Sequence, residues 1–263
     1  MEELTWKNAV GLDIHAQHWA ADAPRAVMVL VHGQGEHIGR YAHVARWYNA
    51  HRVAVLGYDH QGYGRSGGLR GHAPSLDALL DDIGQALREA RWRYPDVPLF
   101  LYGHSMGGNL VLNYLLRRHP DLSGVVATAP WVRLAFPAPL LKVVAGRVLR
   151  HITPALRLPN GLAVHFLSRD HAVVEAYQND PLVHNRLSLA AGIQLLDGAI
   201  WLNGYSGTTP VPLLLQHGGA DRITSAPATG ALAERIRGNV TFREWPGLYH
   251  EIHNEPEQEQ VFR

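Results

Sequence analysis

The 263-residue sequence contains no cysteine. This absence excludes thiol nucleophiles, disulfides, thiolate zinc sites and iron–sulfur clusters. No apolar run reaches the roughly 18 residues that a membrane-spanning helix needs, and the acidic start, Met-Glu-Glu-Leu, lacks the basic and apolar parts of a signal peptide. An excess of one charge is also missing, because a formal net charge of +1 gives no strong field to attract nucleic acid. These absences predict a soluble, cytoplasmic protein if Met1 is the native start.

The rest of the composition is that of a folded domain. Hydrophobic residues make up 46% of the chain and charged residues 18%, so the chain can bury a sizeable core and disorder is not expected. A length of 263 residues fits a single α/β domain, which commonly has roughly 250 residues, together with an insertion.

Short apolar runs alternate with helical patterns along most of the sequence. Runs rich in β-branched residues predict buried strands, and apolar residues three or four apart predict helices. Such alternation predicts an α/β fold, with a mostly parallel central sheet flanked by helices on both faces. The predicted strands cover residues 27–31, 53–58, 98–102, 124–129, 211–216 and 240–245, and the predicted helices cover residues 40–50, 76–87, 109–119 and 226–237.

The alternation stops after Pro130 and resumes at about residue 211. The intervening segment has helical patterns and is rich in Leu, Ala and Val. An insertion after the carboxyl end of a strand lies where parallel sheets bind their ligands. We therefore expect an α/β core formed by residues 1–130 and 208–263, and a helical cap formed by residues 131–207. The alternative is that this segment adds further core helices.

The segment Gly103-His104-Ser105-Met106-Gly107 has the pattern G-x-S-x-G. An apolar strand leads into it and a helical pattern follows it, as a nucleophile at a sharp strand–helix turn requires. Small residues relieve crowding at such a turn, and the start of the helix directs unpaired N–H groups toward developing negative charge. Ser105 is therefore the predicted nucleophile. The alternative is a glycine-rich turn that happens to contain a serine.

A serine hydroxyl needs a base to accept its proton, and the base needs a carboxylate that orients it. In folds with this turn, the acid and then the histidine follow the serine along the chain. Asp221 follows a predicted strand and a glycine turn, and His250 lies in the loop after the next strand. Both should reach the same sheet edge as Ser105. The competing acids and bases are Asp59, Asp197, His217 and His253.

Two backbone N–H groups are expected to stabilise the oxyanion. One belongs to Met106, and the other to Gln34 in the glycine-containing loop 32–36. Neither a metal nor another cofactor is expected. The histidines of the segment 250–253 are three residues apart, whereas the zinc-binding helix motif needs a separation of four. The G-x-G-x-x-G pattern of residues 62–67 follows the wrong strand for a dinucleotide site.

These motifs resemble those of the α/β-hydrolase superfamily and, within it, of monoacylglycerol lipases and related lysophospholipases. The resemblance covers nearly the whole chain, including the predicted cap. The family's closing helix is expected to be short or missing, since the sequence stops at Val261-Phe262-Arg263. The similar segments are His32–His37, Gly39–Tyr41, Asp59–Ser66, Gly103–Gly108, Leu167–Asp170, Asn179–Leu182, Gly192–Leu196, Gly219–Arg222 and Tyr249–His253.

The resemblance implies a serine carboxylic-ester hydrolase, most closely a monoacylglycerol lipase that releases a fatty acid and glycerol through an acyl-serine. It also implies a polar pocket for the glycerol head formed by Arg40, Tyr177 and His253. The family has a glutamate four residues before this tyrosine, where the chain has Val173; Glu175 is near in sequence but points elsewhere on a helix. The alternatives are a lysophospholipase, a carboxylesterase of broad specificity, or an inactive receptor with the same fold.

The apolar residues of the segment 134–149 suit an acyl chain in the predicted cap. The same segment and the residue that follows it contain Lys142, Arg147 and Arg150, which would favour transient contact with a membrane surface. The alternative is that its apolar residues only pack on the sheet. The expected partner is thus a small lipid ester, and the sequence gives no prediction of oligomeric state.

Overall fold

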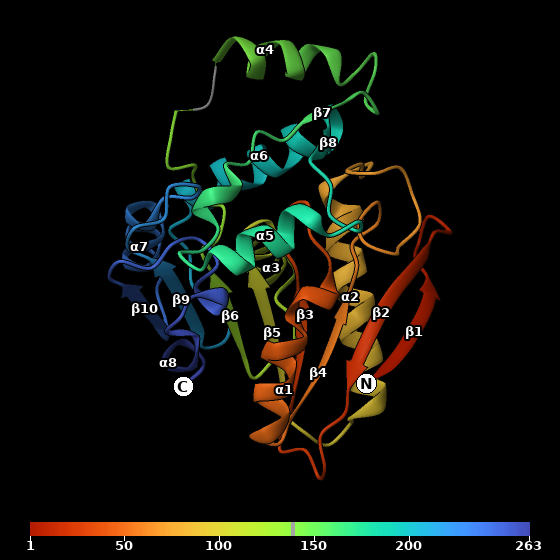
Figure 1. Cartoon of the computed structure of the whole chain (residues 1–263), viewed down its shortest axis with the longest axis vertical. Helices are drawn as coiled ribbons and strands as arrows, with labels where there is room; N and C mark the ends of the chain where they lie inside the picture. The colour runs from red at the N-terminus through yellow and green to blue at the C-terminus, as the bar shows by residue number, and fades with distance from the viewer. Residues whose placement is uncertain (138–139) are drawn as a thin grey trace.

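Eight strands form one sheet in the computed structural model, which describes residues 1–137 and 140–263 (Figure 1). Their order is β1-β2-β4-β3-β5-β6-β9-β10, with β1–β2 and β2–β4 antiparallel and every other pair parallel. The strands are β1 (Glu2–Lys7), β2 (Asp13–Trp19), β3 (Ala26–Val31), β4 (Val53–Tyr58), β5 (Leu99–His104), β6 (Gly124–Thr128), β9 (Leu213–Gly218) and β10 (Val240–Trp245). The predicted α/β fold with a mostly parallel sheet is confirmed.

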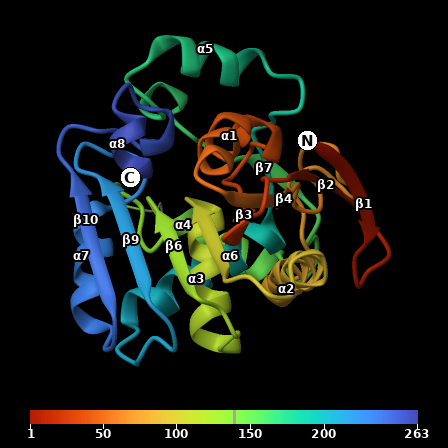
Figure 2. The same ribbon diagram turned by 90° about the horizontal axis from the view of Figure 1, so that it is seen from below.

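Side chains of the central strands pack alternately against two helical layers. On β3, Val27, Val29 and Val31 belong to one hydrophobic cluster, whereas Met28 and Leu30 belong to another. This alternation follows from the two-residue period of a strand, and burial on both faces explains the continuous apolar runs. Seen from below, α1 and α8 lie on one side of the sheet, and α2 and α3 lie on the other (Figure 2). The core helices are α1 (Ala42–Ala50), α2 (Leu76–Arg93), α3 (Met106–Arg118), α7 (Ala226–Arg235) and α8 (Gln258–Phe262), with short 3₁₀ turns η1 (Ile38–Tyr41) and η3 (Ile252–Asn254).

The helix α2 shows how local sequence sets an element. Ser75 caps it, because its Oγ accepts a hydrogen bond from the N–H of Ala78 at 2.9 Å. Leu80, Ile83 and Leu87 then line the buried face at helical spacing. The helix continues to residue 93, six residues beyond the predicted end. The predicted helix over 40–50 is instead η1 followed by α1, and the helix predicted from 109 already begins at 106.

The segment between β6 and β9 lies over the carboxyl ends of the parallel strands (Figure 1). Its largest helix, α6, contacts α2 and α3 of the core. The predicted cap, residues 131–207, falls in this segment; its residues 138–139 are outside the described part of the chain. The elements are α4 (Leu140–Leu149), β7 (Arg157–Pro159), η2 (Val164–Phe166), α5 (His171–Asn179), β8 (Arg186–Ser188) and α6 (Leu189–Gly204). We call residues 131–207 the insertion.

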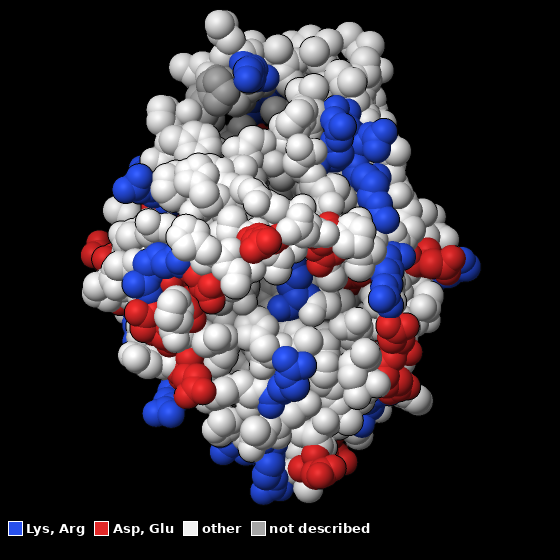
Figure 3. Space-filling view, in the orientation of Figure 1, with Lys and Arg blue, Asp and Glu red and all other residues white. Residues whose placement is uncertain are grey.

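The outer helix of the insertion, α4, exposes apolar side chains. Leu140 is 78% exposed and Leu141 86%, and Val144 and Val148 are also exposed. Only a narrow side of the helix packs inward, at Gly146. The surface over α4, at the top of Figure 3, is mostly uncharged. Within the described residues, no helix combines the length and the apolar character that crossing a membrane would require.

Candidate active site

The predicted nucleophile Ser105 lies alone between the end of β5 and the start of α3. Its φ is +54° and its ψ is −114°, a conformation that costs a non-glycine residue free energy. The turn also brings backbones very close together. A Cβ on Gly107 would lie 2.1 Å from the carbonyl oxygen of Val31, and one on Gly103 would lie 2.4 Å from the carbonyl oxygen of Gly107. Glycine is therefore required at both positions for this turn to form.

Ser105, Asp221 and His250 come together at the carboxyl edge of the sheet. His250 Nε2 lies 2.9 Å from Ser105 Oγ, and His250 Nδ1 lies 2.7 Å from Asp221 Oδ2. A carboxylate can only accept, so Nδ1 carries the imidazole hydrogen and Nε2 accepts from the serine hydroxyl. Asp221 follows β9 and His250 follows β10, which are parallel neighbours. The structure thus brings the predicted nucleophile, acid and base within hydrogen-bond distance.

The Asp221 carboxylate is buried but surrounded by donors. Its Oδ1 accepts from the N–H groups of Ile223 and Thr224, at 2.7 and 3.1 Å. Its Oδ2 accepts from Thr224 Oγ1 at 2.9 Å and from His217 Nε2 at 3.0 Å, in addition to His250. Burial raises its pKa, but the nearby charge of His250 and the histidine hydrogen bonds outweigh this effect and hold it well below the usual range. The group is therefore ionised.

His250 has an environment that suits a base. Burial lowers the pKa of its imidazole, while the Asp221 carboxylate raises it, and the net result is a pKa above the ordinary value. His217, the histidine that competed with it in the sequence, contacts the same carboxylate from another side and has no hydrogen bond to Ser105. Among the residues that the structure describes, only His250 joins the serine to the acid.

The two competing carboxylates have other roles. Asp59 orders its own turn, because its oxygens accept from the N–H groups of Ile38 and Arg65 at 2.8 Å each. Asp197 lies on α6 and forms an ion pair with Arg147 of α4. Neither carboxylate contacts the histidine beside Ser105.

The loop after β3 lies directly against the serine. A Cβ on Gly33 would be 3.3 Å from Ser105 Cβ. The loop is held by Glu36, whose Oε1 accepts from the N–H of Gly33 at 2.7 Å. Gln34 is the next residue of this loop, and Met106 is the first residue of α3, whose N–H has no partner within the helix. Both predicted oxyanion donors therefore belong to segments that adjoin Ser105.

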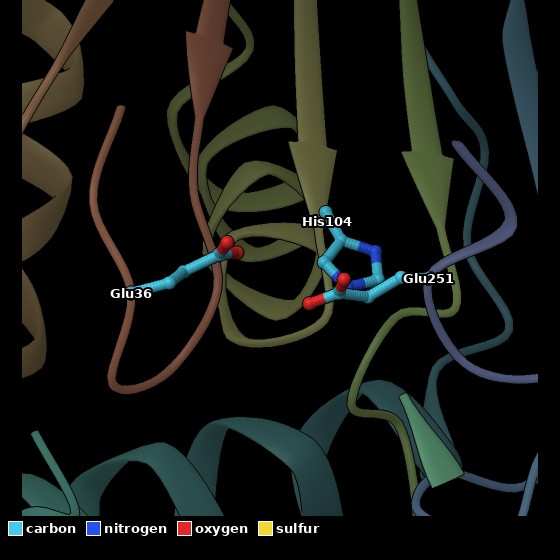
Figure 4. Close-up of side chains that lie close together, drawn as sticks. All are labelled: Glu36, His104 and Glu251. Atoms are coloured by element: carbon cyan, nitrogen blue, oxygen red, sulfur yellow. The ribbon is translucent and has the colours of Figure 1, made fainter. Parts of the chain in front are cut away.

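A buried ionic cluster lies behind the reactive edge. The Arg40 guanidinium donates to both oxygens of Glu251 at 2.8 Å each, and also to Glu36. Figure 4 shows Glu36, His104 and Glu251 facing one another from three separate segments, and their ligand atoms lie within 4.8 Å. Such a group could in principle hold a metal ion, but Arg40 already provides the positive charge to both carboxylates. Burial raises the pKa of both; for Glu251 the effect of Arg40 outweighs it and lowers the pKa, whereas the pKa of Glu36 stays raised.

The three residues expected in the head pocket occupy adjoining positions. The Arg40 guanidinium lies over the Tyr177 ring, 4.8 Å from its centroid. His253 is buried, stacked on Tyr41 at 4.9 Å and edge-on to His104 at 4.7 Å. Burial lowers the pKa of His253 to about 3, so this imidazole is neutral. Tyr177 lines a cavity, whereas Arg40 and His253 lie behind it in the ionic cluster.

Sequence reasoning missed Glu36 and Glu251 as site residues, although both belong to the quoted motifs. No local pattern marked them, because only the structure shows that the Arg40 side chain is largely buried and therefore needs carboxylate partners. Val173, at the family's glutamate position, is half-buried, and Glu175 is exposed. Neither places a carboxylate beside Tyr177.

Two cavities are lined mainly by residues of the insertion, and Ser105, Asp221 and His250 are not among the residues that line them. One, of about 440 Å³, is largely apolar and is lined by Trp131, Leu134, Phe136, Leu196 and Ile200, among others. One of its lining residues, Trp131, donates its N–H to the carbonyl oxygen of Ser105 at 3.0 Å. The other, of about 480 Å³, lies at the opposite end of the insertion and has a more polar lining that includes Tyr177, His184 and Arg186.

The sheet order, the strained serine at the β5–α3 turn and the hydrogen-bonded acid and histidine after later strands define an α/β-hydrolase. A family model described as "Serine aminopeptidase, S33" matches residues 22–257. The chain belongs to this family of α/β-hydrolases.

Individual relatives also match over most of the chain. A monoacylglycerol lipase of Mycolicibacterium smegmatis is 36% identical over 98% of this chain and 93% of its own length. Phospholipase YtpA of Bacillus subtilis is 32% identical over 93% and 95%. An uncharacterised abhydrolase domain-containing protein of Dictyostelium discoideum is 36% identical over 90% of this chain, which spans 25% of that longer protein. The crystal structure of a monoacylglycerol lipase from Paleococcus ferrophilus superposes with a TM-score of 0.87, at 34% identity and 95% coverage of both chains.

Proposed function

We propose that this protein is a monoacylglycerol lipase, which hydrolyses the ester of a single-chain glyceride to a fatty acid and glycerol. The central observation is the bridging position of His250, within hydrogen-bond distance of both Ser105 Oγ and Asp221 Oδ2. The names of relatives that match nearly the whole chain favour this substrate class.

In the proposed mechanism, Ser105 Oγ attacks the ester carbonyl while His250 Nε2 takes the hydroxyl proton. Asp221 keeps the imidazole oriented and stabilises its positive charge. The N–H groups of Met106 and Gln34 stabilise the oxyanion, with about 3 kcal/mol for each donor. The protonated histidine then gives its proton to the leaving alcohol, and water hydrolyses the acyl-serine by the same steps. The reaction needs no cofactor.

We assign separate roles to the two parts of the chain that the sequence predicts. Residues 1–130 and 208–263 form the core that contains the reacting groups, and residues 131–207 form a cap. The apolar cavity beside Trp131 would take the acyl chain. Tyr177 would contact the glycerol head, with Arg40 and His253 supporting it from the ionic cluster.

The exposed apolar side of α4 supports transient contact with a lipid surface, because such a helix lowers its free energy by burying apolar area among lipids. Leu140 and Leu141 point away from the rest of the protein and are the most exposed leucines of this helix. The substrate would then enter the cap from the lipid phase. The cytoplasmic location expected from the sequence remains a prediction.

The variant Ser105→Ala tests the assignment of the nucleophile. It should abolish turnover of monoacylglycerols and of p-nitrophenyl esters, because no group remains to form the acyl intermediate. The matched control is Ser206→Ala, at an exposed serine, which should keep the wild-type rate. An unaltered rate in Ser105→Ala would contradict the proposal. The substrate class is tested separately with monoacylglycerols, lysophosphatidylcholine and simple esters of several acyl lengths. A higher kcat/KM for short esters than for every glyceride would contradict the lipase assignment.

A further inference from the structure

The side chain of Gln34 bridges the core and the insertion. Its Oε1 accepts a hydrogen bond from the Tyr63 hydroxyl at 2.7 Å, and its Nε2 donates to the carbonyl oxygen of Arg186 at 3.1 Å. A carbonyl oxygen can only accept, so the amide nitrogen must face Arg186 and the amide oxygen must face Tyr63. Tyr63 belongs to the core loop after β4, and Arg186 begins β8 of the insertion. Each polar end of the Gln34 side chain therefore has a partner in a different part of the molecule.

The core end of this bridge is held firmly in place. Tyr63 is buried, and its ring lies edge-on to His32, with 5.7 Å between the ring centroids, and stacked on His184 at 4.9 Å. Burial raises the pKa of Tyr63, so the hydroxyl keeps the hydrogen that it donates. The core thus provides a fixed donor for the Gln34 side chain.

The insertion is hydrogen-bonded to the core on both sides of the bridge. The N–H of His184 donates to the carbonyl oxygen of Gly35 at 3.0 Å, and His184 Nε2 donates to the carbonyl oxygen of Gly62 at 3.0 Å. On the other side, the N–H of Ser188 donates to the carbonyl oxygen of Gly71 at 2.8 Å. The carbonyl oxygen that forms the bridge therefore lies between two residues of the insertion that are anchored to the core.

The backbone N–H of Gln34 is the predicted oxyanion donor, and its peptide unit is also held. The carbonyl oxygen of Gly33, in the same peptide unit, accepts from His32 Nδ1 at 2.8 Å. His32 Nε2 accepts from the N–H of His60 at 3.0 Å, which leaves the imidazole hydrogen on Nδ1. The two groups of a trans peptide point in opposite directions, so the Gln34 N–H points away from His32. Nothing in the described part of the chain accepts a hydrogen bond from this N–H, and its neighbour Gly33 lies against Ser105.

We propose that the Gln34 side chain is a positioning group, which makes the direction of the oxyanion N–H of the same residue depend on the docking of the insertion. This inference rests on the proposed esterase mechanism and adds a way in which the insertion controls it. With Arg186 in place, the two side-chain hydrogen bonds hold residue 34 and its N–H in one orientation. When this part of the insertion moves away, Gln34 loses its acceptor and the N–H loses its fixed direction. Oxyanion donors are most effective when they need no reorganisation during the reaction, so undocking lowers the rate of the chemical step.

The test compares p-nitrophenyl butyrate with its thionoester, in which sulfur replaces the carbonyl oxygen. Sulfur accepts hydrogen bonds weakly, so the ratio of the two kcat/KM values, ester over thionoester, measures the contribution of the oxyanion donors. The variant Gln34→Met keeps the length of the side chain but loses both of its hydrogen bonds. It should lower kcat for the ester about tenfold, which is less than the loss of a whole donor, and leave KM nearly unchanged. The ratio should fall by a similar factor.

A second variant removes only one end of the bridge. Tyr63→Phe keeps the ring but loses the hydroxyl, and should lower the same ratio about threefold, as expected for one hydrogen bond. Adding Tyr63→Phe to Gln34→Met should lower the ratio no further, because both changes break the same bridge. The matched control is Tyr94→Phe, which also loses a hydroxyl contact of 2.7 Å, here to His18 Nε2, and should leave the ratio unchanged.

Hydrogen exchange measures the bridge without any turnover. The N–H of His184 should exchange about tenfold faster in Gln34→Met than in the wild type, while the amides of α2 serve as an internal reference. If the wild-type protein turns over neither ester but this difference is found, the proposed function fails and the bridge to the insertion stands. If the wild type is active, an unchanged kcat/KM ratio in the folded Gln34→Met and Tyr63→Phe variants overturns the inference alone. An equal loss for ester and thionoester also overturns it, because the side chain would then only stabilise the fold. An unchanged exchange rate at His184 overturns the link to the insertion.

Discussion

The reactive edge of the sheet and the outer helix of the insertion are built in opposite ways. At the edge, Asp221 is buried and accepts hydrogen bonds at both oxygens, and His250 is held between it and Ser105. On α4, Leu140 and Leu141 are almost fully exposed and contribute little to packing. In the proposed mechanism, the core sets the geometry of the reaction, whereas the insertion would set how a lipid reaches it. Changes in the two regions should therefore affect different measurements.

The largest difference between variants of the reactive edge and variants of the insertion should be seen in kcat/KM. Asp221→Asn should lower kcat/KM by about 10⁴-fold, because an amide can favour the wrong imidazole tautomer. In the wild type, the raised pKa of His250 places the acid limb of the kcat/KM profile above about pH 6.5. Removing the carboxylate that raises this pKa should move the limb of the residual activity to lower pH. Asp197→Asn, in the insertion, is the control and should change neither kcat/KM nor the acid limb of its pH profile. An Asp221→Asn enzyme with a nearly normal rate and limb would contradict this account of the edge.

The next largest difference between the two regions should be seen in the free energy of unfolding. Arg40→Met leaves Glu36 and Glu251 buried without their cation, and should lower the free energy of unfolding by about 3–5 kcal/mol. Arg147→Met breaks an exposed ion pair with Asp197, and should cost no more than about 1 kcal/mol. Urea unfolding of both variants measures the contrast. Equal losses would show that the buried cluster is no more important to the fold than a surface pair.

The buried histidines predict how stability depends on pH. His32 and His253 have pKa values lowered to about 3 by burial, whereas an unfolded histidine has a pKa of about 6.5. Between these pKa values the unfolded chain binds protons that the folded protein does not. The contribution of these two histidines to the free energy of unfolding is therefore fully present above about pH 6.5 and decreases as the pH falls. Each of the two should cost about 1 kcal/mol per pH unit in this range.

Other histidines also contribute to the change of the free energy of unfolding with pH. Burial also lowers the pKa of His60 and His104, whereas the raised pKa of His250 acts in the opposite direction. Urea unfolding at pH 7.5, 6.5 and 5.5 measures the sum. Stability that is constant or increases toward pH 5.5 would contradict the burial of neutral imidazoles.

The smallest effect should come from the exposed helix. Leu140→Gln/Leu141→Gln should weaken partition into phospholipid vesicles about tenfold, because two leucines no longer bury apolar area among the lipids. The thermal midpoint should not change. Trp92→Gln is the control. This tryptophan is also 75% exposed, but it lies on α2, outside the insertion and far from α4 in the sequence. If both variants lose the same affinity, α4 has no special role at the lipid surface.

The parts that the sequence predicts best are those that local patterns determine. The buried parallel strands read as continuous apolar runs, and G-x-S-x-G is recognisable because glycines are needed at the sharp turn around Ser105. Asp221 and His250 follow strands that must end at the same edge, so their meeting could be foreseen. The observed β5 and β9 extend two residues beyond their predicted ends, because backbone pairing continues into the glycine turns.

The parts that could not be predicted depend on contacts between distant segments. The strands β1 and β2 lack a continuous apolar run, and β7 and β8 have only three residues each. The pairing of Arg40 with Glu251 joins residues 211 positions apart, and no local pattern reveals it.

Mapping the covalent adduct of a fluorophosphonate by mass spectrometry tests the central claim most directly. The proposed mechanism predicts one adduct on the wild-type chain, at Ser105, and a much slower reaction in His250→Ala. An adduct at another residue, no adduct on the folded protein, or equal labelling rates in the two proteins would contradict it.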